Sequence, residues 1–260
     1  MNRNKWQFKF VLSAVFLTAA STIAVIPSPS LAEEQSSDWG YGGASNSTRW
    51  GELSSEFETC ELGRDQSPID VSVTEEGEST EIEFDYESTS NVEVVDNGKT
   101  IEVDYEPGNN ITIKNEVYEL VQFHFHTPSE HTIDNESSAM ELHLVHQNEA
   151  GELAVIGILM EAGAENDTIA SIWSAIPSQN KAAQNSGITI DTASLLPEDK
   201  TFVSYDGSLT TPPCNEQVNW NLLLEPIELS VEQIETFESL YPYNARPIQP
   251  LNGRSIELHE

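Results

Sequence analysis

Two short segments with a strict two-residue alternation limit most strongly what this chain can fold into. They are Gln122–His126, which reads QFHFH, and Glu141–His146, which reads ELHLVH; together with the residues between them they hold five of the six histidines. In a β-strand every second side chain lies on the same face. His124 and His126 would then share one face, and His143 would join them if the two strands pair.

Three imidazoles on rigid strands, with no cysteine nearby, are the donor set of a zinc site that keeps a fourth position open for water. A single histidine in a strand is usually a core or surface residue. A third histidine in phase with the first two, with acids close by, favours a metal site formed by His124, His126 and His143. We interpret His131 and His146 as hydrogen-bonded framework residues, because His146 falls on the opposite strand face from His143.

Several further strings resemble one known family and occur in that family's order. They are WGY at Trp39–Tyr41, QSPI at Gln66–Ile69, QFHFHTPSEH, ELHLVH, SLTTPP at Ser208–Pro213 and NARPIQPLN at Asn244–Asn252. Together they resemble an α-class carbonic anhydrase of the bacterial, secreted type, from about Trp39 to Ile256. The resemblance implies a mostly β (α+β) fold, with one domain built on a large, mainly antiparallel twisted sheet of about ten strands and short peripheral helices. It also implies the zinc-dependent, reversible hydration of carbon dioxide to bicarbonate and a proton, by attack of zinc-bound hydroxide.

The resemblance assigns roles to individual residues. It makes His124, His126 and His143 the zinc ligands, and Thr210 the residue that accepts the hydroxide's proton while donating its own to Glu130. The groups that would orient the ligand rings are Gln122, Glu141 and the backbone carbonyl of Asn244, and the first two stand two residues before a ligand on the same strand face. Substrate contacts would come from Thr211 and from an apolar wall of Val145, Val155, Leu209, Val218 and Trp220. Without the resemblance, the wall would be interpreted as core and the threonines as ordinary turn residues.

Lys99 occupies the position at which the resemblance implies a proton-shuttle histidine. Lysine ordinarily titrates far above neutral pH, whereas an efficient proton relay has a pKa near the working pH. We therefore predict either slow, strongly buffer-dependent turnover or a different relay, in which Tyr41 and nearby waters take part. An alkaline working pH would reduce the difference between the working pH and the ordinary pKa of lysine.

The beginning of the chain has the composition of a secretory signal. Basic residues precede an apolar run from Phe10 to Ile26, and Ser30-Leu31-Ala32 places small residues before a cleavage position. We predict a signal peptide at 1–32, a catalytic domain at 33–260 with its core at 39–256, and a secreted or periplasmic protein. An uncleaved membrane anchor is the alternative interpretation.

The two cysteines, Cys60 and Cys214, predict one disulfide in an exported chain. Such a bond would anchor the loop that carries Thr210, because Cys214 follows it closely. Two buried free thiols are the alternative.

The charge of the chain is strongly acidic. Its 260 residues include 44 Asp and Glu against 11 Lys and Arg, for a formal net charge of −33, and removing three basic residues with the leader makes it more negative still. Such a surface repels nucleic acid and anionic membranes, so we expect neither as a partner. Its self-repulsion fits salty or alkaline surroundings. The expected partners are carbon dioxide and bicarbonate, sulfonamides and anions as inhibitors, and a second copy of the chain in a homodimer.

The pattern along the chain predicts strands far more often than helices. Strands are expected at 81–86, 91–95, 100–105, 110–114, 117–126, 139–147, 153–161 and 217–224, with a hairpin turn at Asn97-Gly98. Helices are expected at 167–175 and at 230–241, where Ser230 is a candidate N-cap. Periodicity alone supports only a β-rich single domain.

Two other functions compete with this interpretation. The spacing of His124, His126 and Glu130 also fits the iron or manganese motif of cupin barrels, although Tyr118 replaces the glycine of that motif and His143 comes too early for its distal ligand. The other alternative is a binding module without catalysis, or an acidic protein that binds calcium or mineral. The presence of all three ligand histidines, Glu130 and Thr210 favours the enzyme.

Overall fold

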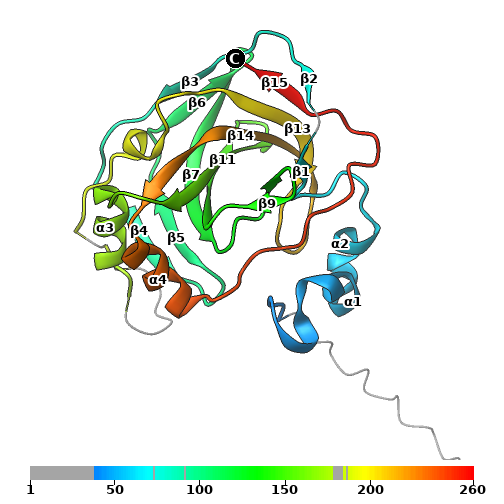
Figure 1. Cartoon of the computed structure of the whole chain (residues 1–260), viewed down its shortest axis with the longest axis horizontal. Helices are drawn as coiled ribbons and strands as arrows, with labels where there is room; N and C mark the ends of the chain where they lie inside the picture. The colour runs from blue at the N-terminus through cyan, green and yellow to red at the C-terminus, as the bar shows by residue number, and fades with distance from the viewer. Residues whose placement is uncertain (1–37, 73, 91, 178–183, 186) are drawn as a thin grey trace, which may run out of the picture. The chain divides into compact units, whose positions relative to one another are not determined.

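The computed structural model describes residues 38–260 except 73, 91, 178–183 and 186 (Figure 1). The predicted signal peptide at 1–32 therefore lies outside the described residues. The described part contains one large β-sheet and short helices, as predicted, and a second, small sheet that the sequence did not predict. The α-helices are α1 (Trp50–Leu53), α2 (Thr59–Leu62), α3 (Asp167–Ser174) and α4 (Val231–Leu240), and 3-10 turns occur at Gly43–Ser45, Ser47–Arg49, Ser55–Phe57 and Thr192–Leu195.

The larger sheet contains twelve strands within the described residues, in the order β12-β4-β5-β7-β10-β11-β14-β13-β15-β2, while β6 pairs with β7 and β3 pairs with β6. The strands are β2 (Glu75–Glu76), β3 (Ile82–Asp85), β4 (Val92–Asp96), β5 (Ile101–Tyr105), β6 (Asn110–Ile113), β7 (Glu116–His126), β10 (Met140–Gln147), β11 (Leu153–Ala162), β12 (Gln184–Asn185), β13 (Phe202–Ser208), β14 (Glu216–Leu229) and β15 (Glu257–His259). The expected sheet of about ten strands is confirmed, and the two-residue strands β2 and β12 account for the difference. The sheet is mixed, because β11 pairs with β14 and β15 with β2 in parallel, whereas the other pairs are antiparallel.

A second sheet has three strands. Two of them come from the segment between β7 and β10, and the third comes from an earlier part of the chain. The sheet consists of β1 (Asp70–Val71), β8 (Thr132–Ile133) and β9 (Glu136–Ser137). The side chain of Asp70 accepts hydrogen bonds from the Thr132 hydroxyl at 2.6 Å and from the Asn135 backbone N–H at 2.7 Å. These contacts connect the segment before β2 to the loop that follows β7.

The pairing of β7 with β10 places the histidines as the alternation predicted. His143 lies opposite His124, and Glu141 lies opposite His126. The register shifts between Val145 and His146. The pairing is therefore regular from Glu141 to Val145, the part that carries His143 and faces the two histidines of β7.

Hydrophobic side chains fill both sides of the sheet. The larger cluster contains Phe123 and Phe125 of β7, which point away from the histidine face, together with Phe237 of α4. Helix α4 begins as predicted, because Ser230 accepts a hydrogen bond from the Gln233 N–H and the Gln233 side chain accepts one from the Ser230 N–H. The two longer helices therefore pack against the side of the sheet that does not carry the histidines (Figure 1).

Strands β13 and β15 were missed by the sequence pattern, and β14 extends past the predicted end of its strand. Polar residues and Gly207 interrupt the alternation of β13, and Gly207 is required by close packing: a Cβ there would lie 2.2 Å from Ser67 Oγ. Strand β14 continues past the predicted end at Leu224 as far as Leu229. The β11–β14 register shifts between the Ile158–Leu223 and Met160–Ile227 pairs, and this irregular step contains Pro226.

The predicted disulfide between Cys60 and Cys214 is confirmed; it joins residues 154 positions apart. Gln66 donates from Nε2 to the Cys214 carbonyl at 3.1 Å, and Arg246 donates to the Cys60 carbonyl at 2.8 Å. Within the described residues, none of the helices has the length and apolar character that a membrane crossing needs.

Candidate active site

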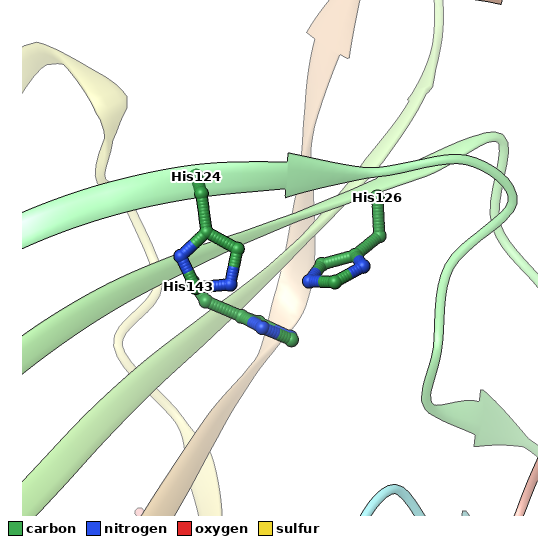
Figure 2. A group of neighbouring side chains, drawn as sticks. All are labelled: His124, His126 and His143. Carbon is green, nitrogen blue, oxygen red and sulfur yellow. The ribbon is translucent and has the colours of Figure 1, made fainter. Parts of the chain in front are cut away.

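The three histidines predicted as metal ligands converge on one point. Figure 2 shows the His124 and His126 rings projecting from one strand and the His143 ring rising beside them from its neighbour. One nitrogen from each ring falls in a set whose members all lie within 4.8 Å of one another. His126 and His143 are fully buried, whereas His124 is partly exposed. Burial therefore restricts the motion of two of the rings, and the group is open to solvent on the side of His124.

Each ring uses its other nitrogen in a hydrogen bond. His124 Nδ1 lies 2.9 Å from Gln122 Oε1, His126 Nδ1 lies 2.8 Å from the Asn244 carbonyl oxygen, and His143 Nε2 lies 2.8 Å from Glu141 Oε1. These acceptors require the ring nitrogens to donate, which leaves a lone pair on each remaining nitrogen.

The remaining nitrogen of His126 shows that the site fits a metal ion. His126 Nε2 is buried and has no hydrogen-bond partner in the described part of the chain, and a buried polar atom normally has one. Burial lowers the pKa of His126 to about 4, and burial followed by the charges of the other two histidines lowers the pKa of His124 well below its usual value. Neutral imidazoles with converging lone pairs are suited to zinc.

Glu141 holds this group from behind. Its Oε1 accepts hydrogen bonds from His143 and from His131 Nδ1 at 2.7 Å, and its Oε2 accepts the backbone N–H groups of Glu130 and His131, both at 2.8 Å. Burial alone would raise the pKa of Glu141, but His131, His143 and these hydrogen bonds bring it well below its usual value.

The two other histidines of this region are framework residues, as predicted. His131 bonds to Glu141 and, through Nε2, to Tyr205 at 2.6 Å. His146 is stacked on Tyr86 and lies 2.7 Å from its hydroxyl. His131, Glu141 and His143 also form a compact donor set, but hydrogen bonds within the set already join the donor atoms.

Thr210 and Glu130 lie close together beside the histidines. Burial raises the pKa of Glu130 to about 7, and the neighbouring His143 and the Thr210 side chain act in the opposite direction. Glu130 Oε1 accepts the Arg246 backbone N–H at 2.7 Å. This carboxylate lies 3.6 Å from His126 Nδ1, the nitrogen that does not face the other histidines. Glu130 is therefore outside the converging group, which argues against the cupin interpretation.

The loop that carries Thr210 and Thr211 is held at both ends. Leu209 donates its N–H to the Asn215 carbonyl, and Cys214 donates its N–H to the Thr211 carbonyl, both at 2.9 Å. The disulfide at Cys214 adds a covalent anchor. Thr210 is buried and Thr211 is partly exposed.

The five residues predicted as an apolar wall belong to one hydrophobic cluster. Val155, Val218 and Trp220 are buried in it, and Val145 and Leu209 pack against it. The Trp220 ring centroid lies 4.8 Å from that of His143, so the wall adjoins the metal-ligand group.

Tyr41 belongs to the N-terminal segment of the described chain, and Lys99 contacts the same segment. Burial and then the charge of Glu130 raise the pKa of Tyr41 well above its usual value, so this hydroxyl lies near the predicted Thr210–Glu130 pair. Lys99 Nζ lies 3.2 Å from Asp38 Oδ1 and 5.2 Å from the centre of the Trp39 ring. The Lys99 ammonium is thus held by the segment that precedes Tyr41.

Three residues near the site were missed by sequence reasoning. Glu102 and Asp104 of β5 lie opposite His124 and Gln122 of β7, and burial, followed by the charge of Asp104, raises the pKa of Glu102 to about 7. Their two-residue spacing was a usable signal, but only the pairing of β5 with β7 places them here. Arg246 was contained in the string NARPIQPLN, without any local sign that its N–H reaches Glu130.

The site thus combines three strand histidines that could hold a metal ion with a neighbouring threonine–glutamate pair and an adjacent hydrophobic cluster. The family model for eukaryotic-type carbonic anhydrase matches residues 45–260. A carbonic anhydrase of Nostoc sp. is 43% identical over 226 residues, covering 84% of this chain and 85% of the relative, and one of Pectobacterium atrosepticum is 36% identical over 255 residues, covering 98% and 99%. The solved α-carbonic anhydrase of Thermovibrio ammonificans in complex with sulfanilamide has a TM-score of 0.81 at 37% identity, covering 85% of this chain and 98% of that structure.

The chain belongs to the α-carbonic anhydrase family. It is therefore an enzyme of the lyase class, in a family that hydrates carbon dioxide and uses zinc.

Proposed function

We propose that this protein hydrates carbon dioxide reversibly to bicarbonate and a proton, with His124, His126 and His143 holding a zinc ion. The observation that carries the proposal is the buried, unpartnered Nε2 of His126 within a set of three converging ring nitrogens. Zinc, when bound, supplies a Lewis acid that makes water a nucleophile at neutral pH, an effect for which carbonic anhydrase is the standard example.

The ring partners keep the ligands ready for the metal. Gln122, Glu141 and the Asn244 carbonyl each accept a hydrogen bond from the ring nitrogen that faces away from the other histidines. This fixes the tautomer and the orientation of each ring. Glu141 also adds a negative charge behind His143, which makes that imidazole a stronger donor.

Thr210 orients the attacking oxygen. Its hydroxyl donates a hydrogen bond to the Glu130 carboxylate, so its oxygen lone pair accepts a hydrogen bond from the nucleophile and turns the nucleophile's own lone pair toward the substrate. The Arg246 N–H on Oε1 favours the carboxylate form of Glu130. The same arrangement disfavours anions that cannot donate a hydrogen bond to Thr210.

The apolar wall receives the substrate. Carbon dioxide is small and uncharged, and Val145, Val155, Leu209, Val218 and Trp220 offer it a surface without charge. Thr211, which is partly exposed, provides a polar contact for bicarbonate.

A stopped-flow assay of carbon dioxide hydration tests the proposal. The purified full chain, supplied with zinc, should accelerate hydration, and sulfanilamide should abolish the acceleration. Metal analysis should find zinc in the wild type and a loss of zinc in His143→Ala. Hydration at the spontaneous rate with zinc bound would indicate a binding module without catalysis, and iron in place of zinc would contradict the proposed metal.

We also propose export and salt tolerance for this enzyme. The disulfide supports an oxidising compartment, and the predicted signal peptide at 1–32 supports a secreted or periplasmic destination. The charge of −33 supports work in salty or alkaline surroundings. A melting temperature that does not rise when salt is increased from low to molar concentration would contradict the salt proposal. N-terminal sequencing of the exported protein tests the cleavage position. Light scattering tests whether the enzyme is a homodimer.

A further inference from the structure

We propose that Asn97-Gly98, at the hairpin turn between β4 and β5, is a self-modifying site at which the side-chain amide of Asn97 is lost and the carboxylate of aspartate or isoaspartate takes its place. The proposed function gives this dipeptide no role. Both residues are exposed, Gly98 has a φ of 76°, and the space where a Cβ would stand at Gly98 is open for 4 Å. The Gly98 nitrogen is therefore unobstructed by a side chain.

The reaction needs only water as a co-reactant. The Gly98 backbone nitrogen attacks Asn97 Cγ, a new N–Cγ bond forms, and the Cγ–Nδ2 bond breaks. The proton of the Gly98 N–H leaves with Nδ2 as ammonia, and the product is a five-membered succinimide ring. Water then opens the ring on either side of its nitrogen, which gives aspartate or isoaspartate.

Hydrogen bonds in the turn are placed to assist the attack. Asn97 Oδ1 accepts the backbone N–H groups of Lys99 and Thr100, both at 3.0 Å. Negative charge develops on this oxygen as the nitrogen approaches Cγ, and two donors aimed at it stabilise that charge. The Gly98 N–H itself donates to Asp96 Oδ1 at 3.1 Å, so a carboxylate already faces the proton that must leave.

The chain contains a second Asn-Gly pair, which serves as an internal comparison. Asn252-Gly253 is also exposed, but Asn252 has a φ of 53° and binds through its nitrogen, with Nδ2 donating to the Arg64 carbonyl at 2.8 Å. This contact holds Nδ2, the atom that must leave, and it does not polarise the side-chain carbonyl of Asn252 as the two N–H groups polarise that of Asn97. Asn97 should therefore convert faster than Asn252, by on the order of tenfold, which is less than an enclosed oxyanion hole provides.

The turn is connected to the candidate metal centre. Asn244 Nδ2 donates to the Lys99 carbonyl at 3.1 Å, and the Asn244 carbonyl accepts the hydrogen bond from His126 Nδ1. Thr100 Oγ1 also donates to the Phe125 carbonyl, next to His126. Isoaspartate adds a backbone atom to the turn and removes the two N–H contacts on Oδ1. It should therefore weaken the contacts that hold the His126 ring in place. This consequence rests on the proposed metal site.

Peptide mass mapping of the full chain during incubation in mildly alkaline buffer tests the modification itself. The expected result is the mass gain of an amide-to-acid conversion in the Asn97 peptide, about tenfold faster than in the Asn252 peptide. Asp96→Ala, which removes the carboxylate without adding an amide, should slow the conversion of Asn97 and leave that of Asn252 unchanged. Equal rates at the two asparagines, or no effect of Asp96→Ala, would overturn the proposed assistance by the turn.

Zinc retention tests the consequence separately. Wild-type protein aged until Asn97 has converted should lose zinc to a chelator severalfold faster than fresh protein. Asn97→Ser, which keeps a hydrogen-bond acceptor but has no amide to lose, should age without this change. Equal zinc release from aged and fresh wild type would overturn the coupling to His126, while the mass map would still decide the modification.

Discussion

His126 Nδ1 lies 2.8 Å from the carbonyl oxygen of Asn244, a residue 118 positions later in the chain. The side chain of Asn244 holds this carbonyl in place: Oδ1 accepts the Thr127 N–H at 2.7 Å, and Nδ2 donates to the Phe125 carbonyl at 2.9 Å. The residues on both sides of His126 are thus bound to the same asparagine that orients its ring.

Asn244→Ala should therefore weaken zinc binding although the carbonyl remains. The zinc dissociation constant should rise by about 10- to 100-fold, the range found when the partners of metal ligands are altered. Buried groups left without partners should also lower the free energy of unfolding by about 1–3 kcal/mol. Chelator competition and urea unfolding measure the two effects. Asn215→Ala, at an exposed position, is the control and should change neither.

Thr210→Ala should lower kcat/KM by about 100-fold, because the attacking oxygen loses the hydroxyl that orients it. Thr210→Ser keeps the hydroxyl and should recover most of the rate. Stopped-flow hydration at equal zinc content measures both variants. Thr236→Ala, on the exposed face of α4, is the control for loss of a threonine hydroxyl. Equal rates for the alanine and serine variants would contradict the orienting role.

Lys99→His should raise the maximal hydration rate at neutral pH in dilute buffer. An imidazole there can exchange protons near neutrality, whereas the Lys99 ammonium is bound to Asp38 and lies over Trp39. Concentrated buffer should reduce the difference, since it carries protons away without a relay. Lys200→His, at an exposed position, should have no effect. An unchanged rate at low buffer concentration would place the relay elsewhere.

Glu102→Gln should stabilise the protein at alkaline pH and leave its stability in acid nearly unchanged. The pKa of Glu102 is raised from 4.5 to about 7 in the folded chain, so the folded state binds the proton more tightly and wild-type stability falls as the pH rises between these values. The side chain is only partly buried, so the gain above pH 7 should be about 1–2 kcal/mol. Urea unfolding across this pH range measures it, with the exposed Glu83→Gln of β3 as control. A gain that is the same at all pH values would contradict the assignment.

Local periodicity was enough to predict the histidine face. The alternation of β7 and β10 is a property of neighbouring residues, so it gave the shared side of His124 and His126 and the expected place of His143. It also placed Gln122 and Glu141 beside the rings that they hold.

Contacts between distant segments could not be obtained in this way. The Asn244 carbonyl was expected at His126 only because of the family resemblance, and the Arg246 N–H at Glu130 was not expected at all. The raised pKa of Glu102 depends on burial and on Asp104, which only the folded sheet determines. The parallel pairing of β11 with β14 and the strand β13 depend on the same long-range packing.

The disulfide also restricts how this protein can be made. Cys214 is synthesised 154 residues after Cys60, so the first thiol has no partner of its own until most of the polypeptide has been translated. A chain that stops before that point carries a sulfhydryl that can bond only to another molecule. Truncated products should therefore accumulate as mixed or intermolecular adducts, while only full-length chains can close the bond within themselves.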